Sequence, residues 1–253
     1  MIQSEETATV VDLAKEAEAA LSEAKRYMYF SRSKECQKEQ RQRLFVIKER
    51  VRGFKRGAAT AQNEVAANQF FHIQCILNGA ISHIDMLVHL KGRDFHKAWD
   101  KLIDAYEYLS VAEKAMAAAN AGKGFATEDF RTELEHAEKA FFPPMPMYQS
   151  WGVVMQGGRC SVCSKPFSEC NHSEGRVYWG KLCVRLEPEI VECDHVAMVK
   201  DPKDRRCIIT GVERDGHMRD HFTWKQKEKV EVRDEHLSKL SVVIFNNGCI
   251  EID

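Results

Sequence analysis

Four metal-ligand side chains lie close together in the sequence, and they constrain the fold more than any other feature. They are Cys160, Cys163, Cys170 and His172. A Cys-x2-Cys turn can place two sulfurs roughly 2.3 Å from one Zn²⁺ ion, and the following Cys-x-His pair can complete a tetrahedral shell. Because a filled Cys3His shell leaves no position for water, the run predicts a structural rather than a catalytic zinc site.

Other readings of these cysteines are less favoured. They could be ordinary reduced thiols, buried or on the surface. A disulfide framework is disfavoured because the nine cysteines are odd in number and no secretory leader pattern is seen, so we expect a cytoplasmic protein. Cys183 and Cys193 are reserve ligands. If Cys183 shares the site, we expect His172 to give up its place.

The composition changes near residue 143 and predicts two domains. Ala, Glu, Lys and Leu dominate before this point, whereas Gly, Val, Ile and Cys are frequent after it. Prolines at 143, 144 and 146 stop a helix at the joint. We therefore predict an α+β protein with a helical bundle at 1–142, a Pro-rich joint at 143–149 and a zinc-stabilised β domain at 150–253.

The first half shows helical periodicity throughout. A seam of apolar and small residues begins at Val10, and a polar stretch from Ser31 to Arg43 either continues that helix through solvent or breaks it. Further helices are expected over 64–90, from the N-cap Asp94 to residue 119, and over 127–142. These elements predict an antiparallel bundle, and the seam of the first helix is a candidate for self-association.

The second half reads as short strands separated by turns. Strands are expected over 176–179, 183–186, 190–193, 196–199, 207–212, 242–245 and 249–252. The pairs Asp215-Gly216 and Asn247-Gly248 suit tight hairpins, so the sheet should be mostly antiparallel.

Charge and hydropathy bear on the partners. The formal net charge of −1 provides no global attraction to nucleic acid. No uninterrupted apolar run approaches the roughly 20 residues that span a bilayer, so no membrane partner is expected. A basic stretch still makes nucleic acid a candidate partner, and the alternative is a solvated helix face. Its candidate contacts are Arg41, Arg43, Lys48, Arg52, Lys55 and Arg56.

Two nuclease families share fragments of their motifs with this chain. Asp194-His195 after a Cys pair partly resembles HNH-type nucleases, which implies metal-dependent cleavage, with His217 and His221 as late ligands. The second Cys pair and the Asn of that family are missing, so strand-end polar residues are the preferred interpretation. Arg131 and His136 fit the Arg-x4-His pattern of HEPN-type ribonucleases, which implies metal-independent RNA cleavage.

The segment 160–183 resembles zinc-knuckle or zinc-ribbon modules, and this resemblance covers about a tenth of the chain. It implies metal binding and says little about the partner. A glycine-rich phosphate loop and the common hydrolase motifs are missing from the sequence. The sequence therefore favours a non-catalytic zinc-binding scaffold that forms homo-oligomers through its helices and binds a protein or a nucleic acid.

Overall fold

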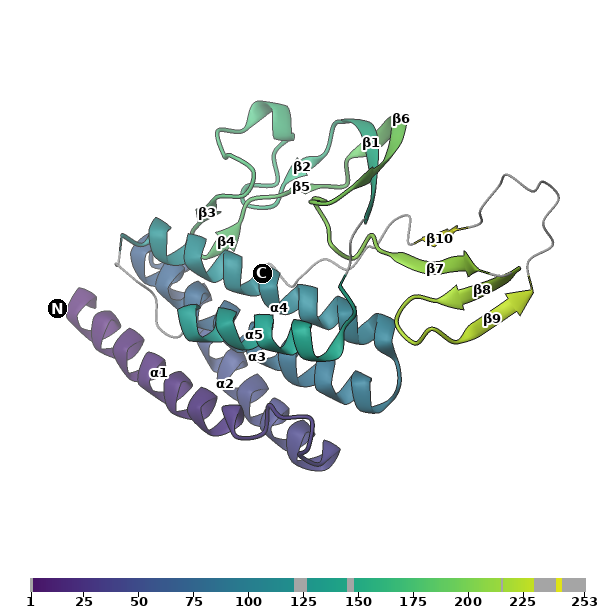
Figure 1. Ribbon diagram of the computed structural model, residues 1–253. Coiled ribbons are helices and arrows are strands. Elements are labelled where there is room, and N and C mark those ends of the chain that lie inside the picture. The colour runs from purple at the N-terminus through teal and green to yellow at the C-terminus, as the bar shows by residue number, and fades with distance from the viewer. Residues whose placement is uncertain (1, 121–126, 145–147, 215, 230–239, 243–253) are drawn as a thin grey trace. The chain divides into compact units, whose positions relative to one another are not determined.

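The computed structural model describes residues 2–120, 127–144, 148–214, 216–229 and 240–242 (Figure 1). Contacts within the chain divide it into two compact units. The first contains the described residues of 1–136 and 157–189, and the second contains those of 137–156 and 190–248. The predicted joint at 143–149 placed the cysteine-rich segment with the later strands, whereas the contacts group this segment with the helices.

Five helices in the described residues account for the first half of the chain and confirm the predicted bundle. They are α1 (Ile2–Lys25), α2 (Lys34–Thr60), α3 (Glu64–Lys91), α4 (Phe95–Ala118) and α5 (Thr127–Phe141). Polar side chains cap the N-termini of three of them: Ser33 accepts from Cys36 N, Asn63 from Ala66 N and Asp94 from Lys97 N. Asp94 is the N-cap that the sequence predicts. The polar stretch after residue 30 breaks the first helix, because Ser33 begins a new one.

Helix α3 is the centre of the first unit. It packs against α1, α2 and α4, and its side chains are buried on every face over most of its length. Among the described helices it alone is long and apolar enough to cross a membrane by length and composition, although polar residues interrupt its apolar stretch. Most of that apolar stretch is covered by the rest of the protein. Burial on all sides explains its composition.

Gly79 lets another helix approach α3. A Cβ atom at this position would lie 2.9 Å from Cε1 of Phe130 on α5 and 3.5 Å from the Ala105 carbonyl oxygen of α4. Phe130 and Leu134 of α5 are both buried. The glycine that weakens α3 locally therefore makes room for the aromatic ring of a neighbouring helix.

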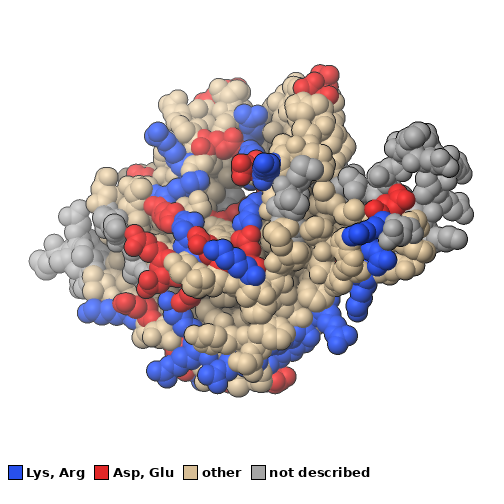
Figure 2. Space-filling view, in the orientation of Figure 1, with Lys and Arg blue, Asp and Glu red and all other residues tan. Residues whose placement is uncertain are grey.

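The apolar seam of α1 is used within the chain. Leu13, Ala17, Leu21 and Ala24 of α1 are all buried, as is Met28 just beyond its end, and α1 contacts both α2 and α3. The seam proposed for self-association is therefore occupied by the protein's own helices. Lys, Arg, Asp and Glu side chains are mixed on the visible surface of the helices, as expected from their ion pairs (Figure 2).

Short strands in the first unit frame the cysteine-rich segment. β2 (Arg159–Cys160) pairs antiparallel with β5 (Arg185–Leu186), and β3 (Val177–Tyr178) pairs with β4 (Lys181–Leu182). A 3₁₀ turn, η1 (Phe167–Glu169), lies between the two ligand pairs. β3 and β5 lie within the strands predicted at 176–179 and 183–186, whereas β2 and β4 were not predicted.

The second unit contains longer strands. β1 (Tyr148–Gln156) pairs with β6 (Glu189–Val199), a single strand where two were expected, and neither β1 nor the strands between residues 217 and 229 were predicted. A second sheet has the order β10-β7-β8-β9, with β7 (Ile209–Arg214), β8 (His217–Asp220), β9 (Gln226–Lys229) and β10 (Leu240–Val242). The strands predicted over 242–245 and 249–252 lie outside the described residues, except for residue 242.

The buried histidine of α3 makes the stability of the bundle depend on pH. His83 is 3% exposed and its ring lies 6.1 Å from that of Phe130. Burial disfavours the charged imidazolium and lowers the pKa of His83 to about 4. The unfolded chain, with a His pKa of about 6.5, therefore takes up this proton first as the pH falls.

We predict that His83 contributes to a loss of stability between about pH 6.5 and pH 4, on the order of 3 kcal/mol. Urea unfolding at pH 7 and pH 5 measures the loss, and His83→Leu should reduce the difference between the two values. His136→Gln, an exposed change on α5, is the control and should leave the difference unchanged. Equal pH sensitivity in the wild type and His83→Leu would contradict this account.

Candidate metal centre

The four predicted ligands converge in the first unit. Cys160 ends β2, Cys163 lies in the turn that follows, and Cys170 and His172 come directly after η1. Their ligand atoms all lie within 4.8 Å of one another, and no other group of three or more His, Cys, Asp or Glu ligands is found in the described part of the chain. The structure therefore contains a Cys3His group that can hold a metal ion.

One distance within the group is close to the edge of a tetrahedral metal site. A Zn–S distance of about 2.3 Å implies neighbouring sulfurs about 3.8 Å apart. Cys160 Sγ lies 3.7 Å from Nδ1 of His172, close to the edge of such a tetrahedron. Sulfur and imidazole nitrogen are also the donor types that structural zinc sites use.

The backbone around Cys160 forms a tight turn, and the segment 157–189 that contains the four ligands is called the knuckle below. The Val162 amide donates to Cys160 Sγ at 3.4 Å, and the Ser164 amide donates to the Cys160 carbonyl at 2.8 Å. Ser164 has φ 61°, a left-handed conformation that closes the turn. On the other side, the His172 ring packs edge-on against Tyr178 with centroids 4.7 Å apart. The ligands are thus oriented by local backbone and aromatic contacts.

Hydrogen bonds favour the thiolate form of Cys160. Burial raises the pKa of this thiol, but donation from the Cys163 and Val162 amides and from neighbouring thiols outweighs burial and lowers the pKa to about 6. A thiolate is the form of cysteine that binds metal. The site therefore presents at least one ligand in its binding form near neutral pH.

Cys183 lies beside the group as a fifth thiol. Its Sγ is 3.8 Å from Cys160 Sγ, and the side chain is fully buried. Burial and the neighbouring Cys160 thiol raise its pKa to about 12. The other reserve ligand, Cys193, is exposed on β6 and is not a member of the group.

The knuckle is fixed to the helices through the β3–β4 turn. The Gly180 amide donates to Oδ1 of the buried Asn68 at 2.7 Å, and the Trp179 amide donates to Glu64 Oε1 at 3.2 Å. A Cβ atom at Gly180 would lie 2.9 Å from the Ala67 carbonyl oxygen. The sequence signal for this contact was the Trp179-Gly180 pair, which reads as a turn but does not identify α3 as its partner.

The residues of the HNH-like interpretation do not form a ligand group. His195 Nδ1 lies 2.9 Å from Asp194 Oδ2, and both side chains are more than half exposed on β6. Gly152 of β1 makes space for the His195 ring. His217 on β8 contacts Gln226 Nε2 at 2.8 Å, and His221 is half-buried just after β8. The structure describes all four residues, and none of them belongs to a group of three or more potential metal ligands.

The HEPN-like pair lies on α5. Arg131 Nη2 donates to Glu113 Oε1 of α4 at 2.7 Å, and His136 is exposed on the same helix. Arg131 therefore makes an ion pair that joins two helices.

The basic stretch on α2 is mostly engaged within the protein. Lys48 and Lys55 are each 4% exposed, with their ammonium groups over the rings of Phe45 and Phe71. Three of the candidate arginines form ion pairs: Arg41 with Asp85, Arg43 with Glu23 and Glu39, and Arg52 with Glu49. Arg56 is exposed. The six residues do not present a continuous cationic surface.

Comparison of the chain with known proteins identifies no family. No protein-family model, no curated protein and no solved structure matches the chain. Conclusions about the site therefore rest on its own geometry.

We predict that Gly180→Ala destabilises the protein by about 1–3 kcal/mol more than Gly157→Ala. Both glycines have positive φ, 70° and 65°, so alanine is strained at both. Only the Gly180 Cβ meets a backbone atom of α3, whereas Gly157 faces open space. Thermal and urea unfolding of the two variants measure the difference, and equal losses would show that the turn does not depend on its contact with α3.

Proposed function

We propose that this chain is a non-catalytic scaffold protein in which a structural Zn²⁺ ion holds the knuckle in the shape that docks on the helices. The observation that supports this is the convergence of Cys160, Cys163, Cys170 and His172 into one closed donor group. Four protein donors fill a tetrahedral shell, which suits a structural ion rather than one that activates water.

The small size of the knuckle supports a stabilising role for the metal. Its strands β2, β3, β4 and β5 have two residues each, and isolated strand pairs are only marginally stable in water. Structural zinc contributes about 10–16 kcal/mol of apparent binding energy in small metal modules. A bound ion would therefore offset the entropy of ordering this segment.

Metal analysis tests the proposal directly. We predict about one zinc per chain by elemental analysis. Cys163→Ser should lower metal content and make the protein more sensitive to unfolding, because a hydroxyl is a poor zinc ligand. Cys36→Ser, which changes a half-buried cysteine on α2, is the matched control and should keep the metal.

Chelation provides the outcome that would contradict the proposal. Removing the metal should increase amide hydrogen exchange at 157–189 and release the bond between Gly180 and Asn68. A chain that is purified without metal, and whose exchange and stability are unchanged by added zinc, would exclude a structural ion at this site.

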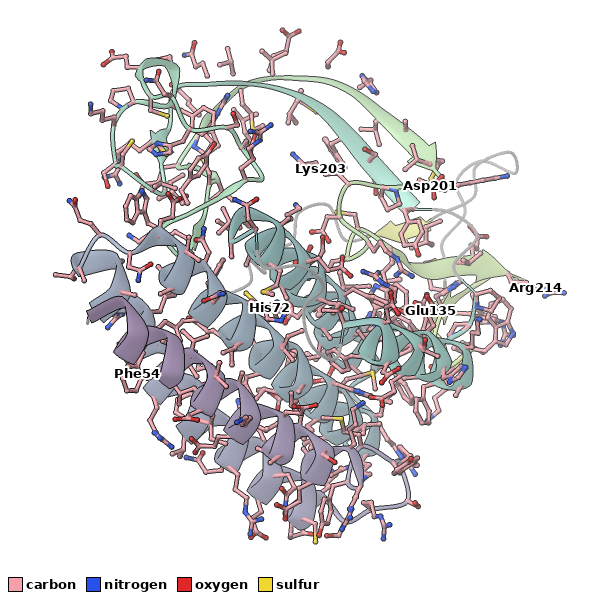
Figure 3. All side chains as sticks on the ribbon, turned by 90° about the vertical axis from the view of Figure 1, so that its left-hand side faces the viewer. Phe54, His72, Glu135, Asp201, Lys203 and Arg214 are labelled. Carbon is pink, nitrogen blue, oxygen red and sulfur yellow. The ribbon has the colours of Figure 1, made fainter. Side chains whose placement is uncertain are left out.

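The scaffold role also includes assembly through the helices, for which α2 offers a surface. Phe54 and Val46 are exposed to 45% and 51%, and Gly53 and Gly57 on the same helix have open space above them. An apolar groove of about 520 Å³ lies here, and the rings of Phe54 and Phe70 stack in it. Figure 3 shows Phe54 on its helix. Small residues beside an exposed aromatic allow a second helix to approach closely.

We predict that the wild-type chain forms a homo-oligomer and that Phe54→Glu shifts it towards the monomer. Light scattering after size-exclusion chromatography measures the mass. Val65→Glu, also at an exposed apolar site but on α3, is the control. A monomeric wild type at high protein concentration would contradict assembly through this surface.

A further inference from the structure

Strand register sorts the side chains of the β7–β9 sheet into two faces. Arg214 of β7 is opposite His217 of β8, and Arg219 of β8 is opposite both Val212 and Gln226. Directly opposed residues in antiparallel strands point to the same side of the sheet. Arg214, His217, Arg219 and Gln226 therefore share one surface, called the basic face below.

The carboxylates lie on the other side. Gly211 is opposite Asp220 and Glu213 is opposite Met218, and both Asp220 and Met218 are buried. Asp220 is held there by an ion pair of 2.8 Å with Lys227. The alternation of the strands thus directs the acids of β7 and β8 away from the basic face.

An aromatic ring completes the basic face. Trp224, in the connection from β8 to β9, is 47% exposed, and the guanidinium carbon of Arg214 lies 6.0 Å from its ring centroid. The turn is ordered, since the Trp224 amide donates to the Asp220 carbonyl at 2.8 Å and Asp220 Oδ1 accepts from the Thr223 amide. Figure 3 shows Arg214 pointing outward from the end of β7. Blue side chains also project from this region in Figure 2.

We propose that the basic face binds single-stranded nucleic acid, with a base stacked on Trp224 and backbone phosphates held by Arg214, Arg219 and the exposed Lys225. Binding of single strands combines a cationic surface with an aromatic platform, because every base has a flat face to stack. An acidic peptide would use only the cations, whereas a nucleic acid would use both the cations and the exposed Trp224 ring. Base stacking therefore favours nucleic acid over protein here.

The strand register places Arg214 and Arg219 on the same face of the sheet. Guanidinium groups bind phosphate oxygens well. The helical stretch that seemed the better candidate in the sequence has two buried lysines and three paired arginines, whereas the basic face combines cations with an exposed ring.

This inference goes beyond the proposed zinc and assembly roles and names a partner for the second unit. Fluorescence anisotropy of the full chain with labelled oligouridylate and oligothymidylate tests it. We expect binding that weakens with a logarithmic salt slope near −2, as for about three phosphate contacts. Trp224→Ala should weaken binding about tenfold while Trp224→Phe largely retains it. The RNA and DNA arms show whether the 2′-hydroxyl contributes.

Charge variants locate the surface. The double variant Arg214→Ala, Arg219→Ala should make the salt slope shallower by about one to two. Arg56→Ala, an exposed arginine on α2, is the matched control and should leave affinity unchanged. Circular dichroism and metal content of each variant verify folding, and the metal content reports on the zinc proposal independently of nucleic-acid binding.

Four results would overturn the assignment. They are undetectable binding to both single strands at about 50 mM salt, duplex DNA bound as tightly as single strands, affinity that survives the changes at Trp224 and Arg214, and affinity that depends on Arg56 instead. Binding of polyglutamate in place of nucleic acid would identify the basic face as a site for acidic peptides.

Discussion

The burial of α3 on all sides is the constraint on which the first unit depends. The helix contacts α1, α2 and α4, accepts the Phe130 ring over Gly79, and holds the knuckle through Asn68. Its interior position forces polar side chains such as His72 and His83 into a dry environment, where burial lowers the pKa of both imidazoles. Figure 3 shows His72 among the helices. The same packing that makes the bundle compact makes it sensitive to acid.

The cysteine-rich segment shows how local and tertiary contacts combine. Local hydrogen bonds to Cys160 shape the ligand turn, while the bond from Gly180 to Asn68 joins the segment to α3. A short turn at 173–176 and the β3–β4 pair join the ligands to this contact, so the shape of the donor group and the docking of the turn are linked along the chain. A buried amide N–H that lost its acceptor would cost about 1–3 kcal/mol.

Sequence patterns predicted the helices well because their signals are local. The cap at Asp94 and the periodic seams determine where helices begin and which sides are buried, and spacing alone identified Cys160, Cys163, Cys170 and His172. Tertiary effects were not readable. Lys48 and Lys55 look like surface cations in sequence, yet packing against α3 buries them.

The strands were harder to predict for the same reason. β1 has weak alternation. Asp194 and His195 were interpreted as strand-end residues, but they lie in the middle of β6, which therefore continues where two strands were predicted. The separation of charge across the β7–β9 sheet appears only when the register is known, since a shift of one residue would exchange its faces.

The chain's path through its two units has a consequence for the order of folding. It leaves the second unit after β1, builds the cysteine-rich segment, and returns with β6 to pair with β1. Pairing of β2 with β5 brings the two ends of this excursion together, which shortens the effective loop that β1 and β6 must close. A cation bound in the knuckle would therefore also speed the pairing of β1 with β6, although neither strand contributes a ligand to that cation.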